Sequence, residues 1–279
     1  MDRSMRQRLL HAMSFQPSPL THISVGCVCT NVNTVVRCEM GDEWKSNNLL
    51  SVLRRDDLDL LLPHFRTLTT DANAVLYDHG QNVETVYFPR DSTLASFMIS
   101  TEDGAVVETM IVGREGAVGG IVSQGRLPAY SRTMVQHGGN FLTLPVSILD
   151  VAKQESRTLD NLFARYADCV LAQILQSTAC NAAHNIEQRA AKWIVSAMER
   201  TNDNEVPLTQ ERLSSMLGVG RSYVSRVMAR FKDDGILMTR RGHILIRDKE
   251  RLEARSCRCN ETVKAHFNDV LKGVYPDTA

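Results

Sequence analysis

Hydrophobic positions change their spacing twice along the chain. In NNLLSVLRRDDLDLLLPHF, residues 47–65, leucines recur at the spacing of one or two short amphipathic helices. Between residues 75 and 145, apolar and polar positions alternate in short runs, which Asp-His-Gly, Pro-Arg-Asp and Glu-Asp-Gly turn signals separate. Helical spacing returns at Ser147 and persists. The pattern therefore predicts a strand-rich unit followed by a helical one.

The strand-rich unit packs many short strands into about eighty residues. A β-roll or small barrel of the jelly-roll kind closes such a set of strands with few open edges. We therefore expect an α+β fold whose N-terminal β-roll covers residues 45–150. Residues 1–44 show no sustained period, and we treat them as an N-terminal extension of undetermined order.

A long helix is predicted over residues 151–184. One of its faces is largely apolar, and such a stripe needs a covering partner. The same helix of a second copy is the more economical partner, which predicts a dimerisation helix and a homodimer. The alternative is that the stripe packs on the chain's own β-roll. The predicted dimerisation residues are Leu159, Leu162, Tyr166, Cys169, Val170 and Gln173.

A helix-turn-helix pattern occupies residues 209–231, inside a domain expected at residues 185–256. Thr209 is a good N-cap for the first helix, and Gly218 suits the tight turn that follows it. The second helix has an apolar inner face and an outer face of Arg and Ser, which suits a DNA major groove. Its inner residues are Val224, Val227, Met228 and Phe231, and its outer residues are Arg221, Ser222, Ser225, Arg226 and Arg230.

Two short β runs around Gly242 predict a wing after this helix pair. Arg240, Arg241 and His243 of the wing are suited to reach a DNA phosphate. The alternative is a structural helical hairpin with solvated arginines. The combination of a turn glycine, a basic second helix and a basic wing favours binding to double-stranded DNA.

Charge is unevenly distributed, although the 279-residue chain is neutral overall. From Asn185 to Cys259, fifteen Lys and Arg accompany ten Asp and Glu, which leaves the rest of the chain negative by five. The C-terminal third is therefore the part suited to a polyanion. We find no membrane-spanning run, no signal peptide and no hydrolase, nucleophile-elbow or P-loop motif. We expect a cytoplasmic protein without a membrane partner that is not an enzyme.

From residue 47 to residue 255 the chain resembles the Crp/Fnr family of bacterial transcription regulators. The resemblance rests on the order of β-roll, long helix and winged helix, and on the motif GVGRSYVSRVMARFKDDGIL. It implies a cyclic-nucleotide-binding-like β-roll, a homodimer that reads a palindromic operator, and RNA polymerase as a partner. The expected divisions are 1–44, 45–150, 151–184, 185–256 and a C-terminal tail at 257–279.

The resemblance also implies roles within the helix pair. Arg221 falls where the cyclic-AMP receptor branch has a groove arginine, and Ser225 with Arg226 matches the Ser-Arg pair of the Fnr branch. Arg226 is the main candidate for bidentate readout of a guanine, a contact worth about 1 to 3 kcal/mol. Both branches have a glutamate where this chain has Ser222, so we do not expect the family's usual half-site. The implied phosphate contacts are Thr209 and Gln210, beside Arg230, Arg240 and Arg241.

The family's nucleotide pocket is matched only in part. In the cyclic-nucleotide branch a Gly-Glu pair binds the ribose, and an Arg-Ser or Arg-Thr pair holds the phosphate. Here Gly119 and Gly120 stand at the first pair, and Arg132 with Thr133 stands at the second. The missing carboxylate costs on the order of several kcal/mol of nucleotide affinity, and Glu115 lies in a different turn. We therefore expect another ligand or none in place of cyclic AMP; the alternative is a cyclic-nucleotide-binding signalling protein.

The chain has seven cysteines, so a regulator that senses redox state or a metal is a further alternative. Cys27, Cys29 and Cys38 invite comparison with the N-terminal iron-sulfur ligands of Fnr-type proteins. Their C-x-C-x8-C spacing is not the family's, and residues 45–150 contain no cysteine to serve as a fourth ligand. The sequence therefore gives an iron-sulfur cluster little support.

A second group of thiols lies in the helical middle and near the C-terminus. Cys180 and His184 are four residues apart on a predicted helix and share a face, and Cys257 and Cys259 follow the wing. Three thiolates and one imidazole form a tetrahedral ligand set for zinc. The alternative is a core cysteine, a helix-end histidine and an exposed pair, because nothing in the sequence shows that the two segments meet.

Overall fold

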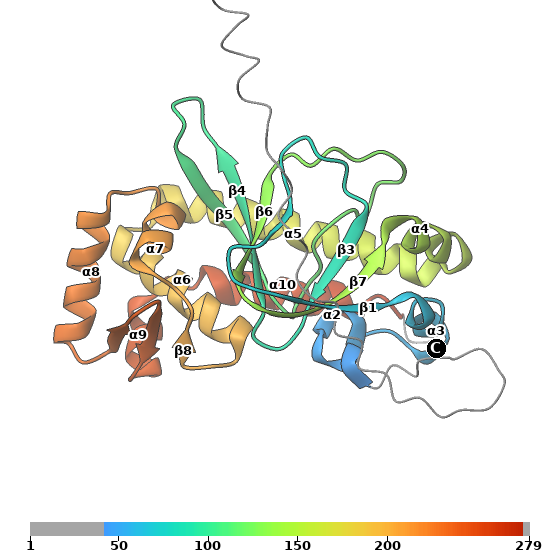
Figure 1. Ribbon diagram of the computed structural model, residues 1–279. Helices are drawn as coiled ribbons and strands as arrows, with labels where there is room; N and C mark the ends of the chain where they lie inside the picture. The colour runs from blue at the N-terminus through green and yellow to red at the C-terminus, as the bar shows by residue number, and fades with distance from the viewer. Residues whose placement is uncertain (1–41, 276–279) are drawn as a thin grey trace, which may run out of the picture.

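The computed structural model describes residues 42–275, in which a strand-rich lobe and a helical lobe lie along one long helix (Figure 1). The first described segment consists of short helical turns: η1 (Asp42–Ser46), α2 (Asn48–Ser51), α3 (Arg55–Asp59) and η2 (Leu62–His64). Its leucines are the amphipathic pattern predicted at residues 47–65, and they point into the strand-rich lobe. The fully buried ones are Leu49, Leu50, Leu58 and Leu61.

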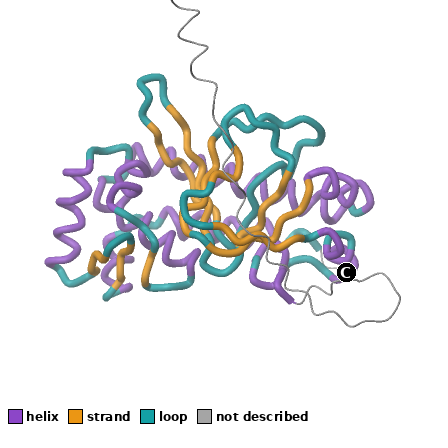
Figure 2. The backbone as a smooth tube through the Cα atoms, viewed as in Figure 1, coloured by secondary structure: helices purple, strands orange, loops and turns teal. Residues whose placement is uncertain are grey.

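The strands form a β-roll of two antiparallel sheets, with the orders β1-β7-β3 and β2-β6-β4-β5. Side chains on their inner faces fill the core, and Val86, Phe88, Leu142 and Leu144 are fully buried. Figure 2 shows these strands gathered in one lobe. They are β1 (Arg66–Thr70), β2 (Val75–Tyr77), β3 (Thr85–Pro89), β4 (Leu94–Ser100), β5 (Val106–Val112), β6 (Arg132–His137) and β7 (Gly139–Pro145). The predicted β-roll is confirmed.

Two helices follow the roll, α4 (Val146–Glu155) and the long α5 (Arg157–Ala183). Ser156 caps α5 by accepting a hydrogen bond from the Leu159 amide at 3.2 Å. The apolar stripe of α5 packs on the roll of the same chain. Leu159, Leu162, Tyr166 and Cys169 are at most 2% exposed, and Val170 and Gln173 are half-buried.

Four of the six residues predicted for dimerisation are therefore buried within a single chain and do not form an exposed face. A stripe of apolar side chains requires a cover but does not specify which surface supplies it. Here the cover comes from the same chain: from its roll, which was the alternative, and from the C-terminal helix at Cys259–Lys272.

The helical lobe begins with α6 (Ile186–Thr201), where Asn185 and Gln188 form a reciprocal capping box. The helix pair α7 (Gln210–Leu217) and α8 (Arg221–Asp233) follows, and α9 (Lys249–Arg255) closes the lobe. The wing is a three-stranded antiparallel sheet in the order β8-β10-β9, with β8 (Glu205–Val206), β9 (Leu237–Arg240) and β10 (His243–Ile246). The lobe has its own core, which includes Ile194, Leu213, Phe231 and Ile244.

The C-terminal segment, which we expected to be a tail, contains a packed helix. Helix α10 (Cys259–Lys272) lies along α5, and Arg165 Nη1 donates a hydrogen bond to the Val270 carbonyl at 2.8 Å. Beyond α10, the Tyr275 hydroxyl donates to Asp57 of α3 at 2.6 Å. The segment thus covers α5 and reaches the roll. Within residues 42–275, no helix has the length and apolar character needed to cross a membrane.

Candidate nucleic-acid interface, ligand cavity and thiol cluster

Local backbone chemistry builds the turn between α7 and α8. Thr209 Oγ1 accepts a hydrogen bond from the Arg212 amide at 3.1 Å and so caps α7. Helix α7 ends at Gly218, whose φ of 64° lies in the left-handed region that favours glycine. Val219 packs against the core of the lobe, and Gly220 begins α8. Helix α8 consequently stands at the outer edge of the molecule (Figure 1).

Helix α8 divides into a buried face and an exposed face, as its spacing predicts. The four apolar residues of the inner face are at most 1% exposed, so packing fixes the helix from that side. The exposed face carries guanidinium and hydroxyl groups. Its residues are Arg221, Ser222, Ser225, Arg226 and Arg230.

Contacts between exposed side chains hold part of this face. Arg221 forms an ion pair with Glu211, and both side chains are 69% exposed. Ser225 Oγ donates a hydrogen bond to Gln210 Oε1 at 2.9 Å. Exposed ion pairs are worth about 0 to 1 kcal/mol, so a DNA partner can replace them at small cost.

Tyr223 belongs to the same surface, and the sequence reasoning missed it. Its side chain is 48% exposed, and the Arg226 guanidinium carbon lies 4.6 Å from the centre of its ring. Stacking of this kind holds the planar guanidinium in one orientation, which favours bidentate contact with a base. The available signal was an aromatic residue among basic ones in the first turn of the helix.

The arginines predicted to contact phosphates lie on α8 and on the wing. Arg230 pairs with Glu187 at 3.2 Å, and Arg240 pairs with Glu205 at 3.6 Å. Both arginine side chains are more than half exposed. Arg241 lies in the turn between β9 and β10 and is also exposed. These cations are accessible to a polyanion.

Helix α7 also packs on β5 of the roll. Ser215 Oγ donates to the Val106 carbonyl at 2.9 Å and accepts from the Glu108 amide at 3.2 Å. The Glu108 side chain is buried, and its Oε1 has no hydrogen-bond partner among the described residues. Burial raises the pKa of Glu108 from its ordinary 4.5 to about 7, although the charge of Arg212 acts in the opposite direction. A titratable carboxyl therefore lies where the roll meets the helix-turn-helix.

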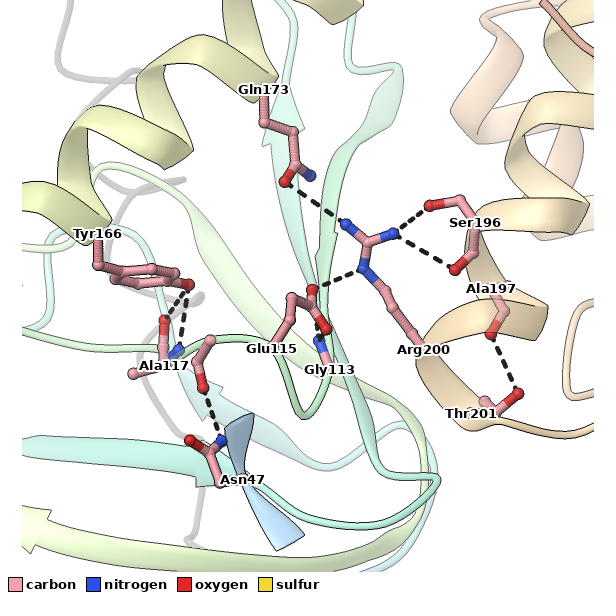
Figure 3. A network of polar contacts seen from close by, with 11 residues as sticks. Asn47, Gly113, Glu115, Ala117, Tyr166, Gln173, Ser196, Ala197, Arg200 and Thr201 are labelled. Carbon is pink, nitrogen blue, oxygen red and sulfur yellow. Dashed lines mark hydrogen bonds and ion pairs between the residues drawn. The ribbon is translucent and has the colours of Figure 1, made fainter. Parts of the chain in front are cut away.

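A second contact between the lobes centres on Arg200 of α6 (Figure 3). Its Nε donates to Glu115 Oε1 at 2.6 Å, and its Nη2 reaches Gln173 of α5 at 3.5 Å. Glu115 also accepts a hydrogen bond from the Gly113 amide at 3.1 Å. The Glu115 carboxylate is thus paired with Arg200. It does not replace the missing carboxylate that would bind a ribose.

Close packing explains two of the four glycines of GREGAVGG. The Tyr166 hydroxyl donates to the Ala117 carbonyl and accepts from the Ala117 amide, both at 3.1 Å (Figure 3). A Cβ at Gly116 would overlap that hydroxyl, and a Cβ at Gly119, whose φ is 123°, would overlap the Thr85 carbonyl. These two glycines are required by the packing of the roll, whether or not a ligand binds.

The four residues of the predicted anion pocket do not line one cavity. Arg132 forms a bidentate pair with Asp78, at 2.5 and 3.0 Å, beside a cavity of about 470 Å³. Thr133, the next residue on β6, is fully buried, because neighbouring residues of a strand point to opposite faces. Gly119 lines a different cavity of about 710 Å³, and Gly120 lines neither. The predicted phosphate site is therefore not assembled.

The larger cavity lies between the roll, α5 and the helical lobe. Glu108 is its one charged side chain among the described residues, and no Lys or Arg lines it. Aromatic and aliphatic side chains make up most of its wall, among them Tyr77, Phe97, Ile99, Met110 and Ile174.

The structure brings together the second group of predicted metal ligands. Cys180, His184, Cys257 and Cys259 come from two distant segments, and their ligand atoms all lie within 4.8 Å of one another. Burial raises the pKa of the Cys180 thiol to about 12. The three cysteines compared with iron-sulfur ligands, Cys27, Cys29 and Cys38, lie outside the described residues.

Comparisons with known proteins agree with this architecture. Residues 188–255 match the family model of the Crp-like helix-turn-helix domain, whereas no curated protein matches the chain. FixK2 from Bradyrhizobium japonicum has a TM-score of 0.60 at 15% identity, over 69% of this chain and 98% of FixK2. A CRP-family transcriptional regulator from Thermus thermophilus has 0.58 at 14% identity, over 67% and 95% of the two chains. The regulator CLP of Xanthomonas campestris has 0.56 at 13% identity, over 69% and 99%.

These findings define a class of protein that combines a cyclic-nucleotide-binding-like roll, a long helix and a winged helix-turn-helix. Identities this low carry the fold and do not carry the ligands or targets of the relatives. Residues 188–255 thus form a Crp-like helix-turn-helix domain, and the chain as a whole has the fold of solved Crp/Fnr-type regulators. The predicted resemblance and fold class are confirmed.

Proposed function

We propose that the protein acts as a homodimer that reads a two-fold symmetric DNA operator, with one copy of α8 in each of two major grooves. The observation that carries the proposal is the exposed face of α8, where Arg and Ser side chains project from a helix whose inner face is fixed by packing. Dimers of helix-turn-helix proteins place their recognition helices about 34 Å apart, one turn of DNA. The operator should therefore be a palindrome with half-sites at that spacing.

Within α8, we assign base readout to the first two turns. Arg226 is the proposed guanine reader, since its guanidinium is oriented by Tyr223 and presents a fork of donors. Ser222 and Ser225 offer short hydroxyls in place of a carboxylate, so a cytosine-reading contact is missing. The proposed base contacts are Arg221, Ser222, Ser225 and Arg226, and the proposed phosphate contacts are Thr209, Gln210, Arg230, Arg240 and Arg241.

We place the dimer interface on the outward face of α5. Leu171, Ile174 and Leu175 are 54%, 48% and 62% exposed there, although each is a large apolar side chain. Exposed positions on this face recur at alternating spacings of four and three, the spacing of a two-stranded coiled coil. They are Ala164, Asp168, Leu171, Leu175, Thr178 and Ala182. A second copy of α5 suits this stripe, which replaces the interface predicted from the sequence.

We further propose that cyclic AMP is not the signal. The larger cavity has no cation to hold a phosphate among the described residues, and Arg132 is engaged by Asp78 outside it. An uncharged, largely apolar molecule fits such a wall better than a cyclic nucleotide. Ile174 and Thr178 lie both at this cavity and on the proposed dimer face, so ligand and partner would share two residues. RNA polymerase is the expected further partner, and we assign no enzymatic activity.

The proposed function is tested by selecting bound sequences from random double-stranded DNA. We expect a palindrome with two half-sites one turn of DNA apart for the full chain. The variant Arg55→Ala, which removes an exposed arginine from α3 of the roll, should select the same palindrome. Recovery of unrelated sequences without two-fold symmetry would contradict the proposal.

A further inference from the structure

Four candidate metal ligands converge where the two lobes of the chain join. Cys180 lies in the last turn of α5, and His184 is the C-cap of that helix. Cys257 lies between α9 and α10, and Cys259 is the first residue of α10. In Figure 1, α10 lies close to α5 and α6, and α10 packs along α5 in the contacts between elements. The tertiary fold therefore assembles a set that the sequence only suggested.

Two of the distances between these ligand atoms match the edges of a tetrahedral zinc site. Cys180 Sγ and Cys257 Sγ are 3.6 Å apart, and Cys259 Sγ lies 3.6 Å from His184 Nδ1. With Zn–S bonds of about 2.3 Å and Zn–N bonds of about 2.0 Å, a tetrahedron has edges of roughly 3.8 Å between sulfurs and roughly 3.5 Å between sulfur and nitrogen. Two of the six distances between the ligand atoms agree with these values to within about 0.2 Å, and all six are within 4.8 Å.

Two other uses of the thiols fit the geometry less well. The Cys180 and Cys257 sulfurs are 3.6 Å apart, so no disulfide joins them in this structure. An iron-sulfur cluster places several iron and sulfide atoms between its cysteine ligands. The four ligand atoms here lie within 4.8 Å of one another, which leaves room for one ion.

The surroundings of the cluster supply one hydrogen-bond donor and one cation to its sulfur atoms. The three cysteines are buried, at 0%, 7% and 6% exposure, and form a small cluster apart from the main cores. Gln176 Nε2 donates a hydrogen bond to Cys259 Sγ at 3.2 Å. The ammonium group of the buried Lys192 acts electrostatically on Cys180. This donor and this cation offset part of the net negative charge that three thiolates leave around a divalent ion.

We propose that Cys180, His184, Cys257 and Cys259 bind one Zn²⁺ ion per chain in a closed structural site. Binding forms three Zn–S bonds and one Zn–N bond, and the three thiol protons pass to solvent. Four protein ligands leave no open position, so the ion has a structural role and no catalytic one. The site ties the C-terminal end of α5 to the start of α10. It would thereby fix the joint through which the DNA-binding lobe leaves the roll, whether or not the dimer and operator proposals hold.

The first test is zinc content in protein purified anaerobically without added metal. We expect one zinc per chain in the full chain, and less than about a tenth of that in Cys257→Ser and in Cys259→Ser. Cys169→Ser changes a buried cysteine of α5 outside the cluster and should retain the zinc. A triple variant, Cys27→Ser with Cys29→Ser and Cys38→Ser, should also retain it. Zinc content unchanged in Cys257→Ser and Cys259→Ser, or lost in the triple variant, would overturn the proposal.

A second test remains informative if the serine variants fold poorly. The chain reconstituted with Co²⁺ should show the visible absorption of a tetrahedral thiolate site. His184→Cys keeps four ligands, so it should retain one metal per chain while its cobalt spectrum shifts toward that of an all-thiolate site. A chain that takes up no cobalt or zinc, that contains iron with acid-labile sulfide at this cluster, or that yields a Cys180–Cys257 disulfide peptide from anaerobic preparations would contradict a zinc site.

Discussion

The helix-turn-helix and the ligand pocket of the roll differ in how much of the family's site each retains. In α8, every feature that DNA binding requires is present: a fixed inner face, an exposed basic outer face and a glycine turn before it. In the roll, the residues that stand at the family's nucleotide cassette are dispersed, and Arg132 is paired with Asp78. The comparison supports our proposals that the protein binds DNA as Crp/Fnr-type regulators do and that its signal is not a cyclic nucleotide.

The largest effect is expected from substitutions on the outward face of α5, the helix that connects the roll to the helical lobe. Leu171→Glu combined with Leu175→Glu should give a monomer, because two carboxylates replace the exposed leucines of the proposed interface. A monomer contacts one half-site, so operator affinity should fall on the order of a thousandfold, toward non-specific binding. Sedimentation and gel-shift titration measure the two changes. Val151→Glu, which alters an exposed apolar residue of α4, is the control.

A Leu159→Glu variant separates this interface from the one predicted by sequence. Leu159 is fully buried against the roll, so the substitution should unfold the chain and should not give a folded monomer. A folded monomeric Leu159→Glu protein would show that the structure assigns the wrong face to the dimer.

Glu108 should make stability depend on pH at the contact between roll and helix-turn-helix. Because its pKa rises from 4.5 to about 7, the folded chain retains a proton that the unfolded chain has lost between these values. Stability contributed by this group is therefore complete below about pH 4.5 and lost as pH rises to 7. Glu108→Gln should abolish that decline and stabilise the chain at pH 8 by about 1 to 3 kcal/mol. Urea titrations from pH 5 to about 8 test this, and an unchanged pH profile would count against a buried, protonated Glu108.

The smallest effect is expected at Arg132, where the family would hold a phosphate. Arg132→Ala removes a pair whose side chains are 50% and 46% exposed, so stability should change by less than about 1 kcal/mol. Calorimetry should detect no cyclic-AMP binding in either protein. If the unaltered chain binds cyclic AMP and Arg132→Ala does not, the roll has kept the nucleotide site of the cyclic-nucleotide branch.

How far the sequence predicts this molecule depends on the distance over which each feature is assembled. The faces of α8 follow from the spacing of Val224, Val227 and Phe231 within one helix, so they could be predicted. The stripe on α5 showed that Leu159 is buried but not whether a second chain or the roll buries it. The sequence could not show whether the nucleotide cassette forms one pocket for the same reason. Gly119 and Arg132 belong to segments whose relative position is set by the whole roll.

The thiol cluster could be predicted in part, because some of its residues are neighbours on one helix and the others come from a distant segment. Cys180 and His184 share a helix face by their spacing, which the sequence shows directly. Their meeting with Cys257 and Cys259 depends on α10 packing along α5, and that packing appears only in the structure. Tyr223 was missed because a half-exposed aromatic residue has no distinct pattern of its own.

The most direct measurement of the central claim, that α8 reads DNA through Arg226, is a gel-shift salt series with Arg226→Ala and Arg55→Ala beside the unaltered chain. We expect Arg226→Ala to lose about 1 to 3 kcal/mol on the selected operator and little on random DNA, since the lost contact is to a base. Arg55→Ala should match the unaltered chain on both DNAs, and all three affinities should fall steeply with salt. Equal binding of Arg226→Ala and the unaltered chain to the operator at every salt concentration would contradict the assignment of α8 as the recognition helix.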